Sequence, residues 1–129
     1  MKTKIAISVL FFLLIGKFSF ADSFRIEFDL NSCKLTSESK KILDENVNLI
    51  KQKTQNGRCT LVISTKSCKK ELKKNRSIGL MRSRAIMDYL EEKYSIERSV
   101  FFIIDEHFNG LEDENCTNTR FVNFRFICE

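Results

Sequence analysis

The sequence predicts an α+β protein, a two-layer sandwich with the order β-α-β-α-β-β. Two helices are expected on one face of a mixed four-stranded sheet. Four segments either alternate apolar and polar residues or are continuously apolar, which predicts strands. Between them lie two segments whose apolar residues recur every three or four positions, which predicts helices. A chain of 129 residues with 43% hydrophobic content has the length of one domain and can bury a modest core. Helices between strands imply crossover connections, with the helices packed on the sheet.

The first strand, helix and second strand are predicted in the N-terminal half. Residues 24–30, FRIEFDL, place apolar side chains on one face of a strand. Thr36 offers a cap for a helix over 36–53, whose apolar residues follow a helical stripe. After a turn at Asn56–Gly57, the short apolar, β-rich segment 59–65 suits a central strand.

The second helix is predicted over residues 76–94, where Ile78, Met81, Ala85, Tyr89 and Leu90 fall on one side. The continuous apolar run that follows predicts a strand over 99–105. Residues 106–118 are polar and read as a loop. The segment 120–127 alternates again and predicts a final strand.

The N-terminus has the three parts of a secretory signal peptide. Lys2 and Lys4 precede the apolar run IAISVLFFLLIG. The small residues Ser19 and Ala21 then form the pattern of a cleavage site after Ala21. We expect residues 1–21 to be removed, which leaves a domain over 22–129 without a transmembrane anchor, exported to the periplasm or outer cell envelope. An uncleaved anchor is the alternative.

Positive charge is concentrated in one part of the expected mature chain. Removing residues 1–21 takes three of the 22 basic residues and no acid, so that 19 bases and 17 acids remain, a net charge of +2. Residues 66–84 contain a single acid, Glu71. The eight bases of the same segment are Lys66, Lys69, Lys70, Lys73, Lys74, Arg76, Arg82 and Arg84. Such a cluster attracts anions; a solvated surface without a partner is the alternative. Nucleic acid is not expected, because the chain is exported and the cluster lacks interleaved aromatic residues.

The sequence does not point to an enzyme. No paired acids, nucleophile with a base, or phosphate-binding loop stands out. With His107 as the single histidine and no CxxC spacing, neither a metal site nor a cofactor is expected.

Three segments, FDLNSCKLT, VISTKS and NRSIGLMRSRAIMDYL, resemble the OmpA-like peptidoglycan-binding domain of outer-membrane proteins, peptidoglycan-associated lipoproteins and flagellar stator proteins. The residues matching the family's first-strand motif are Phe28, Asp29, Asn31 and Leu35. Those matching its second-helix motif are Asn75, Ile78, Arg82, Ile86, Tyr89 and Leu90. The resemblance covers nearly all of residues 22–129.

The resemblance implies that Arg82 and an aspartate clamp the two ends of diaminopimelate from the peptidoglycan stem peptide. A guanidinium binds a carboxylate through two charge-assisted hydrogen bonds. Arg82 is therefore expected to be partly exposed in a ligand pocket. The expected ligand-binding residues are Arg82, Asn75, Ser67, Lys66, Asn31 and Arg120. Coverage of apolar surface by the stem of Arg82 is the alternative.

The departures from the family pattern affect the other half of this clamp. The family's aspartate position is Ser67 here, its threonine is Lys66, and the serine and alanine before and after the arginine are Gly79 and Ser83. A lysine beside the missing acid repels an ammonium group. We thus expect a noncatalytic domain that binds peptidoglycan or another anionic envelope component, with an envelope protein as a further candidate partner. The alternative is a disulfide-stapled structural or protein-interaction module with a vestigial ligand pocket.

Five cysteines follow the expected signal peptide, and export permits disulfides. In the expected topology Cys33, Cys68 and Cys116 lie at the pocket side of the sheet, and Cys59 and Cys128 lie at the opposite side. Strand ends are about 17–20 Å apart, whereas bridged Cα atoms lie within about 7 Å. This predicts Cys59–Cys128 and one bridge among the other three, with Cys68–Cys116 slightly preferred and Cys33 then free.

Overall fold

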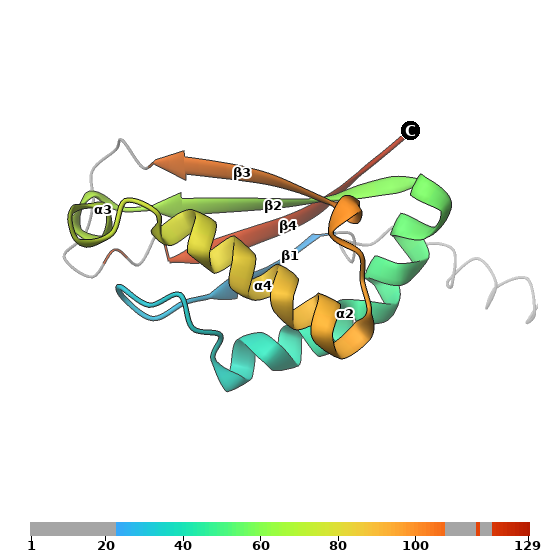
Figure 1. The fold of residues 1–129 in the computed structure, drawn as a ribbon, viewed down its shortest axis with the longest axis horizontal. Helices are drawn as coiled ribbons and strands as arrows, with labels where there is room; N and C mark the ends of the chain where they lie inside the picture. Colours follow the sequence, from blue (N-terminus) through green and yellow to red (C-terminus); the bar gives the residue numbers. More distant parts are fainter. Residues whose placement is uncertain (1–22, 108–115, 117–119) are drawn as a thin grey trace, which may run out of the picture.

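The computed structural model describes residues 23–107, 116 and 120–129 (Figure 1). Its main elements are β1 (Ser23–Glu27), α2 (Ser37–Thr54), β2 (Cys59–Ser67), α3 (Lys69–Lys74), α4 (Ile78–Tyr94), β3 (Phe101–His107) and β4 (Phe121–Cys128). The expected signal peptide over 1–21 and most of the expected loop over 106–118 lie outside the described residues. Within the described part, no helix combines the length and apolar character needed to cross a bilayer.

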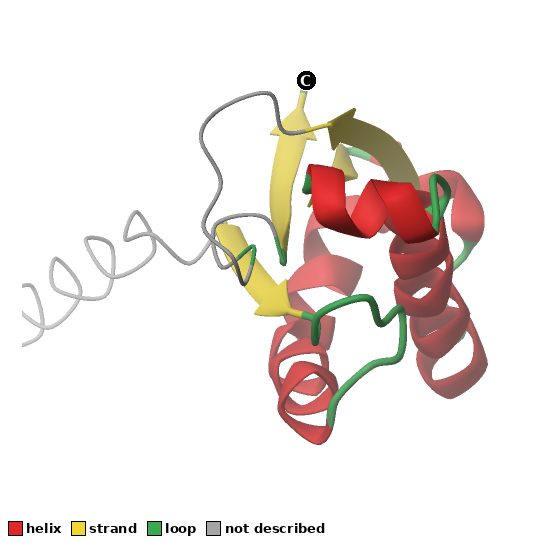
Figure 2. Cartoon of the chain, turned by 90° about the vertical axis from the view of Figure 1, so that its left-hand side faces the viewer, coloured by secondary structure: helices red, strands yellow, loops and turns green. Residues whose placement is uncertain are grey.

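The sheet is four-stranded and mixed, as predicted. Its strand order is β1-β4-β2-β3, in which β2 and β3 run parallel and β4 runs antiparallel to both β1 and β2. Helices α2 and α4 cover one face of the sheet (Figures 1 and 2). The predicted two-layer sandwich is thereby confirmed.

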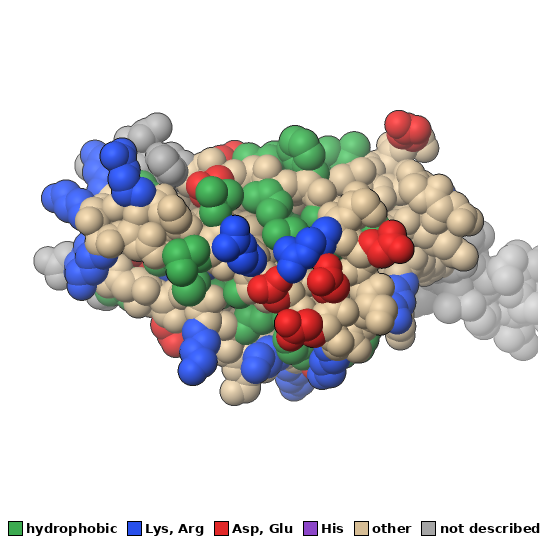
Figure 3. Space-filling model, viewed as in Figure 1, with side chains coloured by type: hydrophobic (Ala, Val, Ile, Leu, Met, Phe, Trp, Pro, Cys, Tyr) green, Lys and Arg blue, Asp and Glu red, His purple; other side chains and the backbone are tan. Residues whose placement is uncertain are grey.

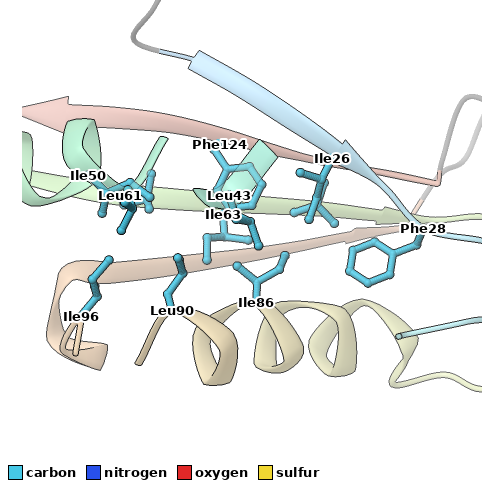
Figure 4. Packing of buried hydrophobic residues seen from close by; sticks show 12 residues of the cluster. Ile26, Phe28, Leu43, Ile50, Leu61, Ile63, Ile86, Leu90, Ile96 and Phe124 are labelled. Carbon is cyan, nitrogen blue, oxygen red and sulfur yellow. The ribbon is translucent and has the colours of Figure 1, made fainter. Parts of the chain in front are cut away.

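The core lies between the sheet and these two helices (Figure 4). Alternate residues of the strands and one stripe from each helix meet there, and fully burying such a side chain stabilises the fold by about 1.5–3 kcal/mol. The buried residues of the cluster are Ile26, Phe28, Leu43, Val47, Ile50, Leu61, Ile63, Ile86, Leu90, Ile96, Val122 and Phe124.

Helix α2 begins at the predicted cap and is tied to the end of α4. The Thr36 hydroxyl accepts a hydrogen bond from the Ser39 N–H at 3.0 Å. At the outer surface, the Asp44 carboxylate accepts hydrogen bonds from the hydroxyls of Tyr94 at 2.5 Å and Tyr89 at 2.7 Å. These bonds, that from Tyr94 above all, lower the pKa of Asp44 below its usual value. The same carboxylate accepts a bond from the Lys93 ammonium at 3.1 Å, so the two helices are held in register.

The buried face of α4 is rotated from the face that the sequence predicted. Its buried residues are Ile78, Gly79, Arg82, Ser83, Ile86 and Leu90. Met81, expected inside, is 40% exposed, and Ala85 and Tyr89 are half-buried. Gly79 permits this rotation because a Cβ at that position would overlap the Asp105 carboxylate and lie 2.8 Å from the Thr65 hydroxyl. The rotation turns Arg82 into the interior.

Two disulfides join strands and loops in the expected pairs. Cys59 and Cys128 face each other across β2 and β4, with Cα atoms 4.1 Å apart. Cys68, at the end of β2, is bonded to Cys116, with Cα atoms 6.0 Å apart. Cys33 is a free, half-buried thiol.

Removing the Cys59–Cys128 bridge should lower the free energy of unfolding by about 3–5 kcal/mol, because the bridge closes a long loop in the unfolded chain. Urea unfolding of the Cys59→Ser/Cys128→Ser variant measures this loss, with Cys33→Ser as the control that removes no bridge. A loss under about 1 kcal/mol would mean that the bridge contributes little.

Gly79→Ala should destabilise the protein, since the new methyl group must displace the Asp105 carboxylate, which accepts a 2.9 Å hydrogen bond from Thr65. We expect a loss of about 1–3 kcal/mol, as in other overpacked sites. The loss should shrink in an Asp105→Ala background, where the obstructing group is absent. Equal losses in both backgrounds would show that Asp105 does not set the close approach.

Candidate functional site

Arg82 is buried within the site rather than partly exposed, so that part of the sequence prediction is wrong. It lies near the start of α4 and is 1% exposed. Its Nε–H donates to the Ser32 carbonyl at 2.9 Å, and its Nη2 group donates to the Asp29 carbonyl at 3.2 Å. The guanidinium therefore holds the loop between β1 and α2 against the first turns of α4.

The remaining guanidinium donors bind the side chain of Glu71, which is 0% exposed. Arg82 Nη1 donates to Oε1 at 3.2 Å, and Nη2 donates to Oε2 at 2.5 Å. The Asn31 N–H donates to the same Oε2 at 2.9 Å, with Asn31 in a left-handed conformation at φ 61°. Both carboxylate oxygens are thus bonded.

The short helix α3 carries Glu71 into this position. Cys68 is the N-cap of α3 in an extended conformation, and its carbonyl accepts the Leu72 N–H at 2.9 Å. At the other end, the Asn75 N–H donates to the Glu71 carbonyl at 2.9 Å. Figure 2 shows α3 lying across the end of the molecule nearest the viewer. The disulfide to Cys116 anchors the start of this helix.

The Glu71–Arg82 pair is a bidentate ion pair whose two side chains are almost completely buried. Arg82 Cζ also lies 5.2 Å from the centre of the Phe28 ring. Two buried charges are tolerated only when their hydrogen bonds are well satisfied, and losing one partner costs about 3–5 kcal/mol. In chemical terms the site is a carboxylate receptor that holds a carboxylate from its own chain.

The other expected residues have different positions. Asn75 is half-buried and serves its own segment, accepting the Ser77 N–H at 3.0 Å. Asn31 contributes its backbone N–H, not its exposed side chain. Ser67 is fully buried, and its hydroxyl has no hydrogen-bond partner within the part of the chain that the structure describes. Lys66 is exposed.

In the described part of the chain, Arg120 makes no hydrogen bond to Arg82 or Glu71 and instead lines a groove beside β1. It is half-buried, its carbonyl accepts the Phe28 N–H, and its Nε is buried without a hydrogen-bond partner among residues 23–107, 116 and 120–129. The groove has a volume of about 510 Å³, and the sequence did not predict it. The groove residues are Arg25, Glu27, Phe28, Asp29, Thr36, Ser37, Glu38, Ser39, Ile42, Arg120 and Phe121.

Glu71 is the residue of this buried network that the sequence prediction missed. One signal was available: it is the single acid in a segment with eight basic residues. A lone opposite charge in such a segment suggests an internal partner, but sequence spacing does not show that it reaches Arg82.

Basic side chains surround this end of the molecule. Figure 3 shows Lys and Arg side chains gathered where α3 lies. The exposed bases of α3 and the segment after it are Lys69, Lys70, Lys73, Lys74 and Arg76. In the part of the chain that the structure describes, no group of three or more His, Cys, Asp or Glu side chains could hold a metal ion.

Solved structures share this architecture at low sequence identity. The peptidoglycan-associated lipoprotein of Burkholderia pseudomallei matches with a TM-score of 0.64 and 13% identity, over 80% of this chain and 89% of that one. The OmpA-like domain of FopA1 from Francisella tularensis matches with 0.62 and 13%, over 83% and 75%. An outer membrane protein of Borrelia burgdorferi matches with 0.57 and 20%, over 80% and 84%. No family model and no curated protein sequence matches. The fold is OmpA-like.

Glu71→Ala should lower the free energy of unfolding by about 3–5 kcal/mol, because it leaves the Arg82 guanidinium buried and unpaired. Formate or acetate should then raise the melting temperature of this variant more than chloride does, by entering the vacated carboxylate site. The matched control is Glu91→Ala, which breaks an exposed ion pair with Arg98 and should cost about 0–1 kcal/mol. Equal responses to acetate in the variant and the wild type would contradict a carboxylate receptor at Arg82.

Proposed function

We propose that this protein is a noncatalytic OmpA-like domain of the cell envelope that works as an interaction module, with its ligand clamp closed by its own Glu71. The observation that carries this proposal is the fully buried, bidentate bond between Glu71 and Arg82. The sequence resembles the OmpA-like family, and one structural neighbour is a peptidoglycan-associated lipoprotein. Binding to peptidoglycan is therefore the activity that the closed clamp is expected to weaken, and the activity that the experiments below measure.

The closed clamp disfavours capture of diaminopimelate. The resemblance implies that Arg82 binds the carboxylate of that ligand. In this structure Glu71 already makes the two hydrogen bonds to Arg82 that such a carboxylate would make. A competing ligand must displace a group attached to the same chain, whose effective concentration is high. Ser67, at the position of the family's acid, supplies no negative charge for the ligand's ammonium group.

Export to an oxidising compartment is part of the proposal. The two disulfides require such a compartment in most organisms, and residues 1–21 have the features of a signal peptide. The periplasm or outer envelope meets both conditions. The disulfides also support a stable module, since each restricts the unfolded chain.

A second candidate function is binding of an anionic envelope polymer, peptidoglycan included, through surface charge. The exposed Lys73, Lys74 and Arg76 at the α3 end favour it. Such binding would weaken strongly with salt, because the Debye length is about 8 Å at 0.15 M ionic strength.

Sedimentation with purified cell-wall sacculi distinguishes a pocket from a charged surface. The Glu71→Leu/Arg82→Met variant removes both buried charges together and should keep the wild-type level of association. Lys73→Glu/Lys74→Glu should lower association at low salt by at least about fivefold, since it reverses two surface charges. Lys40→Glu/Lys41→Glu on α2 is the matched control for net charge.

Titration with a diaminopimelate-containing muropeptide tests the closed clamp directly. The wild type should show no saturable binding below about 1 mM, which corresponds to a binding free energy weaker than about −4 kcal/mol. Micromolar binding that disappears in Glu71→Leu/Arg82→Met would overturn the proposal.

A further inference from the structure

The outer edge of β1 exposes backbone hydrogen-bonding groups. The Phe28 N–H donates to the Arg120 carbonyl at 2.9 Å, which continues the antiparallel pairing of Glu27 with Phe121. In an antiparallel pair, hydrogen-bonded and non-hydrogen-bonded positions alternate. The main-chain groups of Arg25 and Glu27 therefore point away from β4.

One contact supports this orientation. The Ser39 hydroxyl donates to the Glu27 carbonyl at 2.7 Å, from the side opposite to β4. The Glu27 N–H, the Arg25 N–H and the Arg25 carbonyl remain as three main-chain groups on this edge. Because β1 is the terminal strand of the sheet, no described strand covers them.

The 510 Å³ groove lies along this edge. Its floor and rim include the exposed side chains of Arg25 and Glu27 on β1 and the first turn of α2, which begins beyond the end of β1 in Figure 1. The volume is within the range of ordinary ligand sites, about 300–1,000 Å³. The groove thus places side-chain contacts beside the unpaired main-chain groups.

The charges along the groove favour a basic ligand segment. The side chains of Glu27, Asp29 and Glu38 are exposed and form no hydrogen bond or ion pair with any described residue. The two bases differ from one another. Arg25 stacks on the Phe121 ring at 4.2 Å, whereas the Arg120 Nε is buried and has no hydrogen-bond partner among the described residues.

We propose that the β1 edge binds an extended peptide segment of a partner protein as a fifth strand, with basic side chains of that segment facing Glu27, Asp29 and Glu38. Strand addition to an exposed edge obtains its affinity from main-chain hydrogen bonds and its specificity from side-chain contacts. The groove adjoins the Arg82 network, because the Asp29 carbonyl and the Phe28 ring contact Arg82. The main-chain groups of Arg25 and Glu27 take no part in that network, so the proposal stands whether or not Arg82 binds a ligand.

The probe is an acetylated, amidated heptapeptide of alternating lysine and valine, titrated into the oxidised protein and followed by NMR. We expect saturable binding with amide exchange at Arg25 and Glu27 slowed by at least about tenfold, and no protection at β3, the other edge. A peptide N-methylated at alternate residues, which lacks the donors on one edge, should bind at least about tenfold more weakly. A glutamate–valine peptide should not bind.

Matched variants on α2 test the charge contribution. Glu38→Lys, in the groove, should weaken binding of the lysine–valine peptide by about fivefold or more, whereas Glu45→Lys, exposed outside the groove on the same helix, should leave it within about twofold. Saturation that leaves the Arg25 and Glu27 amides unprotected would overturn the proposal. So would equal effects of the two variants, tight binding of the N-methylated peptide, or no saturation at millimolar peptide.

Discussion

The buried ion pair between Glu71 and Arg82 determines how one end of this molecule is assembled. It joins three segments that are distant in the sequence: the loop after β1, the short helix α3 and the first turns of α4. Each carboxylate oxygen and most guanidinium donors have partners in this network. Because a lone buried charge is expensive, the three segments must adopt their positions together. The loop, the helix start and α3 are therefore one structural unit.

The Cys68–Cys116 bridge supports the same unit. A helix of six residues has little stability of its own, because helix nucleation is unfavourable and few hydrogen bonds follow it. The bridge holds the N-cap of α3, and Glu71 follows one turn later, with the bridge sulfur 3.9 Å from its Oε1. The covalent bond thereby reduces the entropy cost of keeping the carboxylate against Arg82. In this OmpA-like fold, the Nη1 and Nη2 groups of the buried Arg82 thus donate hydrogen bonds to a carboxylate of the same chain.

The elements of the sandwich could be predicted from the sequence because each has a strong periodic pattern, from FRIEFDL in β1 to RFVNFRFI in β4. The burial of Arg82 could not. Small residues, Gly79 and Ser83, turn the buried face of α4 away from its most apolar stripe, and their effect depends on the close approach of Asp105. Helix α3 was missed because KKELKK is short and has no apolar period. Arg120 was expected among the ligand-binding residues, but its place in the groove beside β1 depends on tertiary structure that sequence spacing does not show.

The strand order has a consequence for the sequence of events during synthesis. In the order β1-β4-β2-β3, β4 separates β1 from β2 although it follows every other element in the chain. A nascent chain that ends before Phe121 can pair β2 with β3, but β1 has no strand to join. The sheet is completed only when β4 emerges, and Cys128 then reaches Cys59 to form a covalent bond at the finished seam. Because Cys59 and Cys128 face each other only across the paired β2 and β4, oxidation of this cysteine pair marks a chain whose sheet has closed.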